Sequence, residues 1–251
     1  MASAKGGVGK TTMTLMTTSQ LGLLRNDRVI AVECNPHHGT CRSRVPTYHN
    51  RGIKDLLDCV NSLERPTDLT RSMLSRFTTQ EPEARLEVLT APIDPAMRQA
   101  LEEADYRSVL ALVDRYFDIV TMDLGTGLLD PVTQTILGEL SDQVVVIVPA
   151  ALDGAELGMY TLKFITARRG AEWVKEHAIV VVNMVRKDSL LDVDVMERHF
   201  ADLVRSCVRI RWDRHLETGG ILNWEMVDAG TRDDFLVLAA TLGEGFTLAP
   251  S

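Results

Sequence analysis

Three glycines and two lysines lie within six consecutive residues near the start of the chain, in the segment KGGVGKTT from Lys5 to Thr12. Glycine has no Cβ, so backbone N–H groups in such a segment can turn toward an anion and approach it closely. A lysine at the end of the loop adds a point charge for terminal phosphates, and a hydroxyl after it can bind Mg²⁺. The segment therefore predicts a site for the phosphates of a nucleotide.

A phosphate loop of this kind leads into a helix, because the N-terminal end of a helix adds positive potential for an anion. The pattern from Thr11 to Leu24 predicts that helix. The residues expected to hold the nucleotide are Gly6, Gly7, Val8, Gly9, Lys10, Thr11 and Thr12. The strict pattern G-x-x-x-x-G-K-[ST] is not met, because Ala4 stands where its first glycine belongs. Lys5 is a second lysine that this pattern does not require.

With Lys5 in front, the segment resembles the deviant Walker A motif KGGxGK[ST] of the partition and Min-type ATPases, the ParA/MinD family. The resemblance implies ATP and Mg²⁺ as ligands and catalytic roles for Lys5 and Lys10. In that family the early lysine reaches across a dimer interface to the partner's nucleotide, and the resemblance implies the same role for Lys5. The alternative is a glycine-rich entry to a helix without any ligand.

Two later strands resemble other parts of that family's site. FDIVTMDLGTGL (117–128) resembles the Walker B strand, which ends here at Asp123. A carboxylate at the C-terminal end of a strand can hold a Mg²⁺-bound water. VVVNMVRKD (180–188) resembles the strand whose terminal asparagine recognises adenine, which implies this role for Asn183. The alternative for Asn183 is a side chain that satisfies the backbone of a turn.

The segment RIRWDRHLETGG (209–220), together with the helical pattern behind it, resembles the C-terminal part of actinobacterial MinD-like proteins linked to type VII (ESX) secretion. Those proteins typically carry a proline where Arg211 stands. The resemblance implies that Trp212 and Asp213 lie beside the purine. For Arg209 and Arg211 the alternative is two solvated side chains on one face of a strand.

The segment VECNPHHG (32–39) departs from the family pattern D-x-D-P-x-x-G at both acidic positions. Glu33 keeps a carboxylate on a longer arm and is expected, with Thr11 and Asp123, to hold Mg²⁺. Asn35 replaces the aspartate that in the family belongs to switch I and is needed for hydrolysis. Asparagine has an acceptor oxygen but no charge and no basicity. We therefore expect nucleotide binding with slow or absent hydrolysis.

Cysteine and histidine residues cluster in the same segment, in the pattern C-x-x-H-H-x-x-C formed by Cys34, His37, His38 and Cys41. Thiolates and imidazoles are typical zinc ligands, so the pattern allows a zinc site. Zinc sites usually take their ligands from two separate turns, however. The alternative is a buried Cys34 at the end of a strand, followed by histidines of a switch loop.

The rest of the chain must supply the elements that position these residues. Apolar runs rich in Val and Ile predict strands at 28–33, 86–91, 118–123, 143–150, 178–185 and 208–212. Helical patterns follow or precede them at 11–24, 53–60, 67–77, 96–116, 152–176, 191–206 and 231–246, with a break expected near Ala104. Runs such as VVVIV are continuous, which is typical of strands buried on both faces of a parallel sheet. The alternation predicts one α/β domain over 1–251, a doubly wound, mostly parallel P-loop sheet flanked by helices.

A P-loop normally follows a buried strand of about five residues. Here only Met1–Ser3 precede the loop, so we expect this strand to be largely missing from the chain. Its absence should leave apolar surface exposed and backbone groups unpaired in the middle of the sheet.

Composition limits the partners. The net charge is −8, which argues against a global basic field for nucleic acid, although Arg168–Arg169 and Arg209/Arg211/Arg214 are local candidates. The end GFTLAPS is short and uncharged apart from its terminus, so a membrane-anchoring helix is not expected. Four cysteines without a CxxC pair indicate reduced thiols in a cytoplasmic protein.

The sequence thus favours an ATP-binding protein that dimerises with ATP and positions or regulates a protein partner, such as a secretion or positioning apparatus. The alternative is a nucleotide-bound scaffold without useful turnover. A third reading is a ligase of the broader P-loop class, for which we find no substrate-binding motif.

Overall fold

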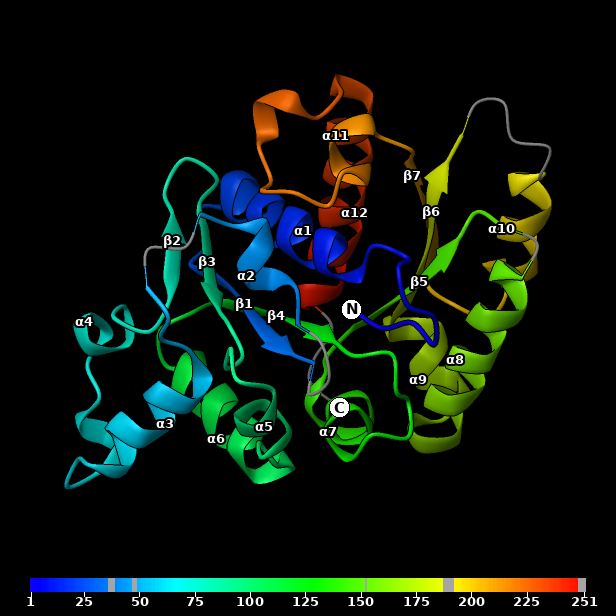
Figure 1. Ribbon diagram of the computed structural model, residues 1–251. Coiled ribbons are helices and arrows are strands. Elements are labelled where there is room, and N and C mark those ends of the chain that lie inside the picture. The colour runs from blue at the N-terminus through cyan, green and yellow to red at the C-terminus, as the bar shows by residue number, and fades with distance from the viewer. Residues whose placement is uncertain (36–38, 47–48, 152, 187–191, 248–251) are drawn as a thin grey trace.

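The computed structural model describes residues 1–35, 39–46, 49–151, 153–186 and 192–247, and its strands form two sheets (Figure 1). The first sheet has the order β2-β3-β1-β4, with β2 Thr79–Glu81, β3 Leu86–Leu89, β1 Val29–Cys34 and β4 Ile119–Leu124. The second has the order β5-β6-β7, with β5 Val144–Pro149, β6 Ala178–Val185 and β7 Ser206–Arg211. All neighbouring strands are parallel except β2 and β3. The predicted α/β class with a mostly parallel sheet is confirmed.

The continuous apolar runs are buried on both faces, as parallel strands require. Every residue of β1 is buried. Along β6, Val180 and Val182 pack into one hydrophobic core, whereas Ile179 and Val181 pack into another on the opposite face. This alternation follows from the period of two in an extended chain.

Helices cover both faces of the sheets. They are α1 Lys10–Arg25, α2 Cys41–Arg44, α3 Ile53–Asn61, α4 Arg71–Leu74, α5 Pro95–Gln99, α6 Glu103–Asp114, α7 Pro131–Thr135, α8 Gly154–Arg169, α9 Ala171–His177, α10 Val193–Ala201, α11 Arg214–Glu217 and α12 Ala229–Glu244. α1 and α12 pack against each other on one face, and α3, α6 and α7 lie on the other side of the first sheet (Figure 1). Within the described residues, no helix is long and apolar enough to cross a membrane.

Some local expectations differ from the structure. The strands expected from apolar runs do not include β2, a short polar strand that pairs antiparallel with β3. The long helical pattern at 152–176 is divided into α8 and α9 by Gly170, whose φ of 88° lies in the left-handed region. The pattern at 67–77 forms only a 3₁₀ turn at Pro66–Asp68 and the four-residue α4, and the break expected near Ala104 lies before Glu103.

Met1 and Ala2 lie between β4 and β5 and bond to both sheets. Ala2 N–H donates to the Val145 carbonyl at 2.8 Å, and Ile147 N–H donates to the Ala2 carbonyl at 2.8 Å. On the other side Met1 bonds to β4 through its nitrogen, which donates to the Met122 carbonyl at 2.7 Å. These two residues hold the place of one more parallel strand that would make the two sheets continuous.

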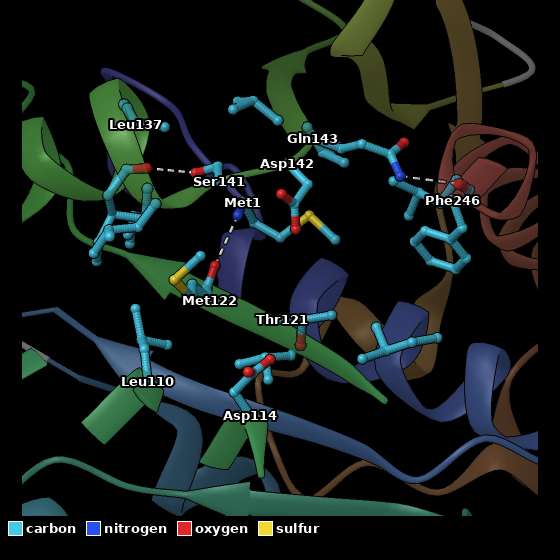
Figure 2. Close-up of a pocket in the computed structure, with 18 of the residues that line it drawn as sticks. Met1, Leu110, Asp114, Thr121, Met122, Leu137, Ser141, Asp142, Gln143 and Phe246 are labelled. Carbon is cyan, nitrogen blue, oxygen red and sulfur yellow. Dashed lines mark hydrogen bonds between the residues drawn. The ribbon is translucent and has the colours of Figure 1, made fainter. Parts of the chain in front are cut away.

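Beyond Met1 the space between β4 and β5 is a cavity of about 460 Å³, hereafter the strand slot (Figure 2). Its apolar lining includes Leu110, Val120, Met122, Leu137, Leu140 and Val144. The first four residues of β4 are only half-buried, unlike those of β1. Burial lowers the pKa of the Met1 amino group to about 6, with Asp123 opposing the shift. The expected exposed apolar surface in the middle of the sheet is therefore present.

Filling the strand slot should stabilise the fold. We expect an alternating Val/Ile segment of five residues, fused before Met1, to raise Tm by about 5–10 °C. Its added hydrogen bonds contribute about 1 kcal/mol each, the entropy of ordering the segment leaves about 2–3 kcal/mol net, and each kcal/mol shifts Tm by about 2–4 °C. Differential scanning calorimetry measures this shift. A Gly/Ser segment of equal length is the control, and an equal Tm for both fusions would contradict the assignment of the slot.

Candidate nucleotide-binding site

The loop from Lys5 to Gly9 has the left-handed backbone conformations that its glycines allow. Gly7 has φ 73° and Gly9 has φ 88°, both in the left-handed region that favours glycine. Gly9 is the N-cap of α1, so the loop ends at the N-terminus of a 16-residue helix. A Cβ on Gly9 would lie 2.6 Å from Asn183 Nδ2, whereas a Cβ on Gly7 would meet no atom within 4 Å. The structure thus requires glycine most strictly at Gly9.

Lys10 lies buried at the start of α1. Its ammonium group donates to the Lys5 carbonyl at 3.2 Å. Burial lowers the pKa of Lys10, and the nearby Asp123 offsets this only in part. An anion at the loop would therefore stabilise the charged form of Lys10.

Two buried carboxylates face the start of α1. The parallel register of β1 with β4 places Glu33 opposite Asp123, and both side chains are buried. Asp123 accepts hydrogen bonds from Thr11 Oγ1 at 2.6 Å and Thr14 Oγ1 at 3.4 Å. Burial is the largest cause that raises the pKa of each carboxyl. A divalent cation would offset this cost, so the hydroxyl and carboxylate oxygens of Thr11, Asp123 and Glu33 fit Mg²⁺.

Glu33 also has a structural task that its sequence position does not reveal. Its Oε1 accepts from Cys41 N–H at 2.9 Å, and its Oε2 accepts from Ala91 N–H at 2.8 Å. A Cβ on Gly39 would lie 2.0 Å from Oε1. The longer arm of glutamate therefore ties two loops to the end of β1 beside the candidate metal site.

The side expected to hold the base lies between α1 and the ends of β6 and β7. A small cavity of about 30 Å³ there is lined by Gly9, Thr12, Asn183, Trp212 and Asp213, among others. Asn183 donates from Nδ2 to the Val8 carbonyl at 2.8 Å, so this side chain fixes the phosphate loop. Both carboxylate oxygens of Asp213 accept backbone N–H groups, from Leu216 and Asp228. The structure brings these predicted residues together, and Asn183 and Asp213 also support the surrounding backbone.

Trp212 and Lys5 lie at the two ends of the site. The guanidinium of Arg186 lies over the Trp212 ring at 4.4 Å from its centroid, and the indole N–H has no partner among the described residues. The Lys5 side chain is half-exposed, and its Nζ lies 2.5 Å from Asp153 Oδ2. This ion pair lowers the pKa of Asp153. Asp153 precedes α8 and was not predicted from the sequence.

The segment after β1 gives a mixed result. Asn35 is half-buried directly behind β1. Cys34 is buried, and its thiol donates to the Val32 carbonyl at 3.6 Å, as the buried-cysteine alternative predicts. His37 and His38 lie outside the described residues. Cys41, by contrast, points at Asp123, with Sγ 3.4 Å from Oδ2. The sequence indicated Cys41 as a possible ligand only through the cysteine and histidine pattern.

Comparison with solved structures identifies the architecture. A ParA family ATPase from Chlorobium tepidum TLS superposes with a TM-score of 0.75 at 16% identity, over 95% of this chain and 96% of the other. MinD from Pyrococcus horikoshii OT3, solved with Mg-ADP, superposes with a TM-score of 0.70 at 16% identity, over 100% of this chain and 97% of the other. The chain has the fold of the ParA and MinD ATPases.

A comparison of sequences relates the chain to a protein associated with secretion. The ESX-1 secretion-associated protein EspI of Mycobacterium tuberculosis is 31% identical over 248 residues, which cover 98% of the chain. The chain spans 36% of the length of that relative. No protein-family model matches. The predicted likeness to secretion-linked proteins is confirmed.

The two left-handed glycines allow a matched test of the loop. We expect Gly7→Ala to lower the free energy of unfolding by about 1 kcal/mol through backbone strain alone. Gly9→Ala should cost about 2–4 kcal/mol, because its Cβ adds a clash with Asn183 Nδ2 to the same strain. Urea unfolding of the nucleotide-free proteins measures both values, and equal costs would contradict the close approach of Asn183.

Proposed function

We propose that this protein is an ATP-dependent dimerisation switch that positions or regulates a protein partner. The observation that supports it most is the separation of the two loop lysines. Lys10 is buried against the loop, whereas Lys5 is half-exposed at its mouth and paired with Asp153. An exposed ion pair of this kind is weak and easily exchanged for another anion. This exchangeable pair supports a role in which Lys5 leaves Asp153 for the phosphates of a nucleotide held by a second subunit.

The residues of one subunit divide the work of holding ATP. Backbone N–H groups of the loop and Lys10 bind the phosphates, and Asn183 keeps the loop in its shape. Thr11, Asp123 and Glu33 would hold Mg²⁺, which neutralises charge on the phosphates when it is bound. Asn35, next to this site, replaces the expected carboxylate and has no basicity with which to activate water.

A protein partner is favoured over nucleic acid. Arg209 pairs with Asp194 and Glu197, and Arg211 pairs with Asp234. These basic residues are thus partly neutralised, which leaves less charge for phosphate contacts. The similarity to EspI, whose name associates it with ESX-1 secretion, supports a secretion-linked partner.

The proposal predicts that ATP turnover rises more than linearly with protein concentration and that Lys5→Ala removes this rise. Loss of a charge-assisted hydrogen bond costs about 1.5–3 kcal/mol, so the dimer should weaken at least about tenfold in the presence of ATP. Analytical ultracentrifugation with ATP or ADP measures the dimer, and a fluorescent nucleotide measures binding, which Lys5→Ala should retain.

Two variants control this experiment. Lys10→Ala sets the background because it should abolish nucleotide binding. Lys163→Ala removes an exposed lysine on α8 and should leave dimerisation unchanged. Unaltered dimerisation of Lys5→Ala with ATP would refute the proposed role of Lys5.

The second candidate function is a nucleotide-held scaffold without useful turnover, which Asn35 favours. If Asn35 limits hydrolysis, Asn35→Asp should raise the steady-state rate at least about tenfold, which corresponds to about 1.4 kcal/mol of activation free energy. The rate is measured as released phosphate against the Lys10→Ala background. An unchanged rate in Asn35→Asp, with nucleotide binding intact, would remove Asn35 as the cause of slow turnover.

A further inference from the structure

Three buried side chains with metal-binding atoms meet beside the phosphate loop. Glu33 lies near the end of β1, Cys41 starts α2, and Asp123 lies near the end of β4. Their ligand atoms all lie within 4.8 Å of one another. The side chains belong to residues that are 1%, 0% and 1% exposed. We call these three residues the sulfur–carboxylate cluster.

Two contacts of Cys41, one from its backbone and one from its side chain, fix the position of this residue. Its backbone N–H donates to Glu33 Oε1 at 2.9 Å, and its Sγ lies 3.4 Å from Asp123 Oδ2. The same Asp123 oxygen accepts from Thr11 Oγ1, which is half-buried and marks where the cluster opens toward the phosphate loop. The sulfur therefore faces the carboxylate that the candidate magnesium site shares.

Sulfur changes what this site can bind. Mg²⁺ takes oxygen ligands almost exclusively, whereas a thiolate selects softer cations. Zn²⁺ accepts mixed sets of thiolate and carboxylate ligands. We propose that Cys41, Asp123 and Glu33 form a site for a thiophilic divalent cation such as Zn²⁺, which competes with Mg²⁺ for Asp123.

Binding of the cation needs no other reactant. On binding, the Cys41 thiol releases its proton to solvent, and the sulfur forms a bond to the cation. Asp123 and Glu33 supply negative charge that holds the cation. Cys34 lies outside the cluster, so this site differs from the C-x-x-H-H-x-x-C pattern of the sequence. It does not depend on dimerisation or on ATP hydrolysis.

Cd²⁺ is the probe, because its bond to a thiolate gives an ultraviolet charge-transfer band. We expect the nucleotide-free protein to bind one equivalent of Cd²⁺ with this band, and excess Mg²⁺ to leave the band in place. Cys41→Ser should lose the band and weaken Cd²⁺ binding at least about tenfold, the loss that removal of even a supporting metal contact causes. Cys207→Ser removes a thiol on β7 and is the matched control, which should keep both.

A second variant separates a lost ligand from a lost fold. Asp123→Asn keeps all four cysteines and should also weaken Cd²⁺ binding, and circular dichroism melts verify that each variant is folded. A band that persists in Cys41→Ser, or that Asp123→Asn leaves at full affinity, would overturn the proposal. The absence of a one-equivalent band in the parent protein would do the same. Because no nucleotide is present, none of these results tests the dimerisation switch.

Discussion

The parallel pairing of β1 with β4 places two buried carboxylates side by side, and the rest of the site is arranged around them. Glu33 and Asp123 are opposite each other in this register. α1 presents Thr11 and Thr14 to Asp123, while the loops at Cys41 and Ala91 bind Glu33 through their backbone N–H groups. A shift of β4 by one residue in this register would turn Asp123 to the face opposite Glu33. Sheet pairing, rather than loop sequence, therefore decides whether the two carboxylates of the proposed cation site lie together.

The phosphate loop is held in place by a small number of contacts with the two sheets. Met1 and Ala2, directly before it, bond to the strands on both sides, and the strand slot lies before them. Asn183 supplies a second support from β6, through its bond to the Val8 carbonyl. The geometry of the loop thus depends on contacts from the second sheet as well as on its own glycines. Asn183, which was expected to recognise adenine, therefore also holds the loop in place.

The sequence predicted the parts that local chemistry determines. The glycine loop, Lys10, Asp123 and the buried Val/Ile strands follow from residue types at fixed spacing. In the structure the loop ends at the start of α1, Lys10 is the first residue of that helix, Asp123 lies on β4, and β1 is buried throughout. β2 was missed because three polar residues, TQE, carry no apolar period, and only the pairing with β3 makes them a strand. Asp153 was missed, and Cys41 was named only as one member of the C-x-x-H-H-x-x-C pattern, because each reaches its partner across a long distance in sequence. Lys5 lies 148 residues from Asp153, a separation that no local pattern can bridge.

In the ligand-free site, the charge states of Lys10, Glu33 and Asp123 would link the binding of phosphates to the binding of a divalent cation. Burial favours the neutral form of Lys10 and the protonated forms of Glu33 and Asp123. Phosphates need Lys10 charged, and a divalent cation needs the carboxylates charged. The attraction between Lys10 and Asp123 means that charging one favours charging the other. Each of these two ligands would therefore lower the cost of binding the other, which is a favourable (negative) coupling free energy between the two proposed sites.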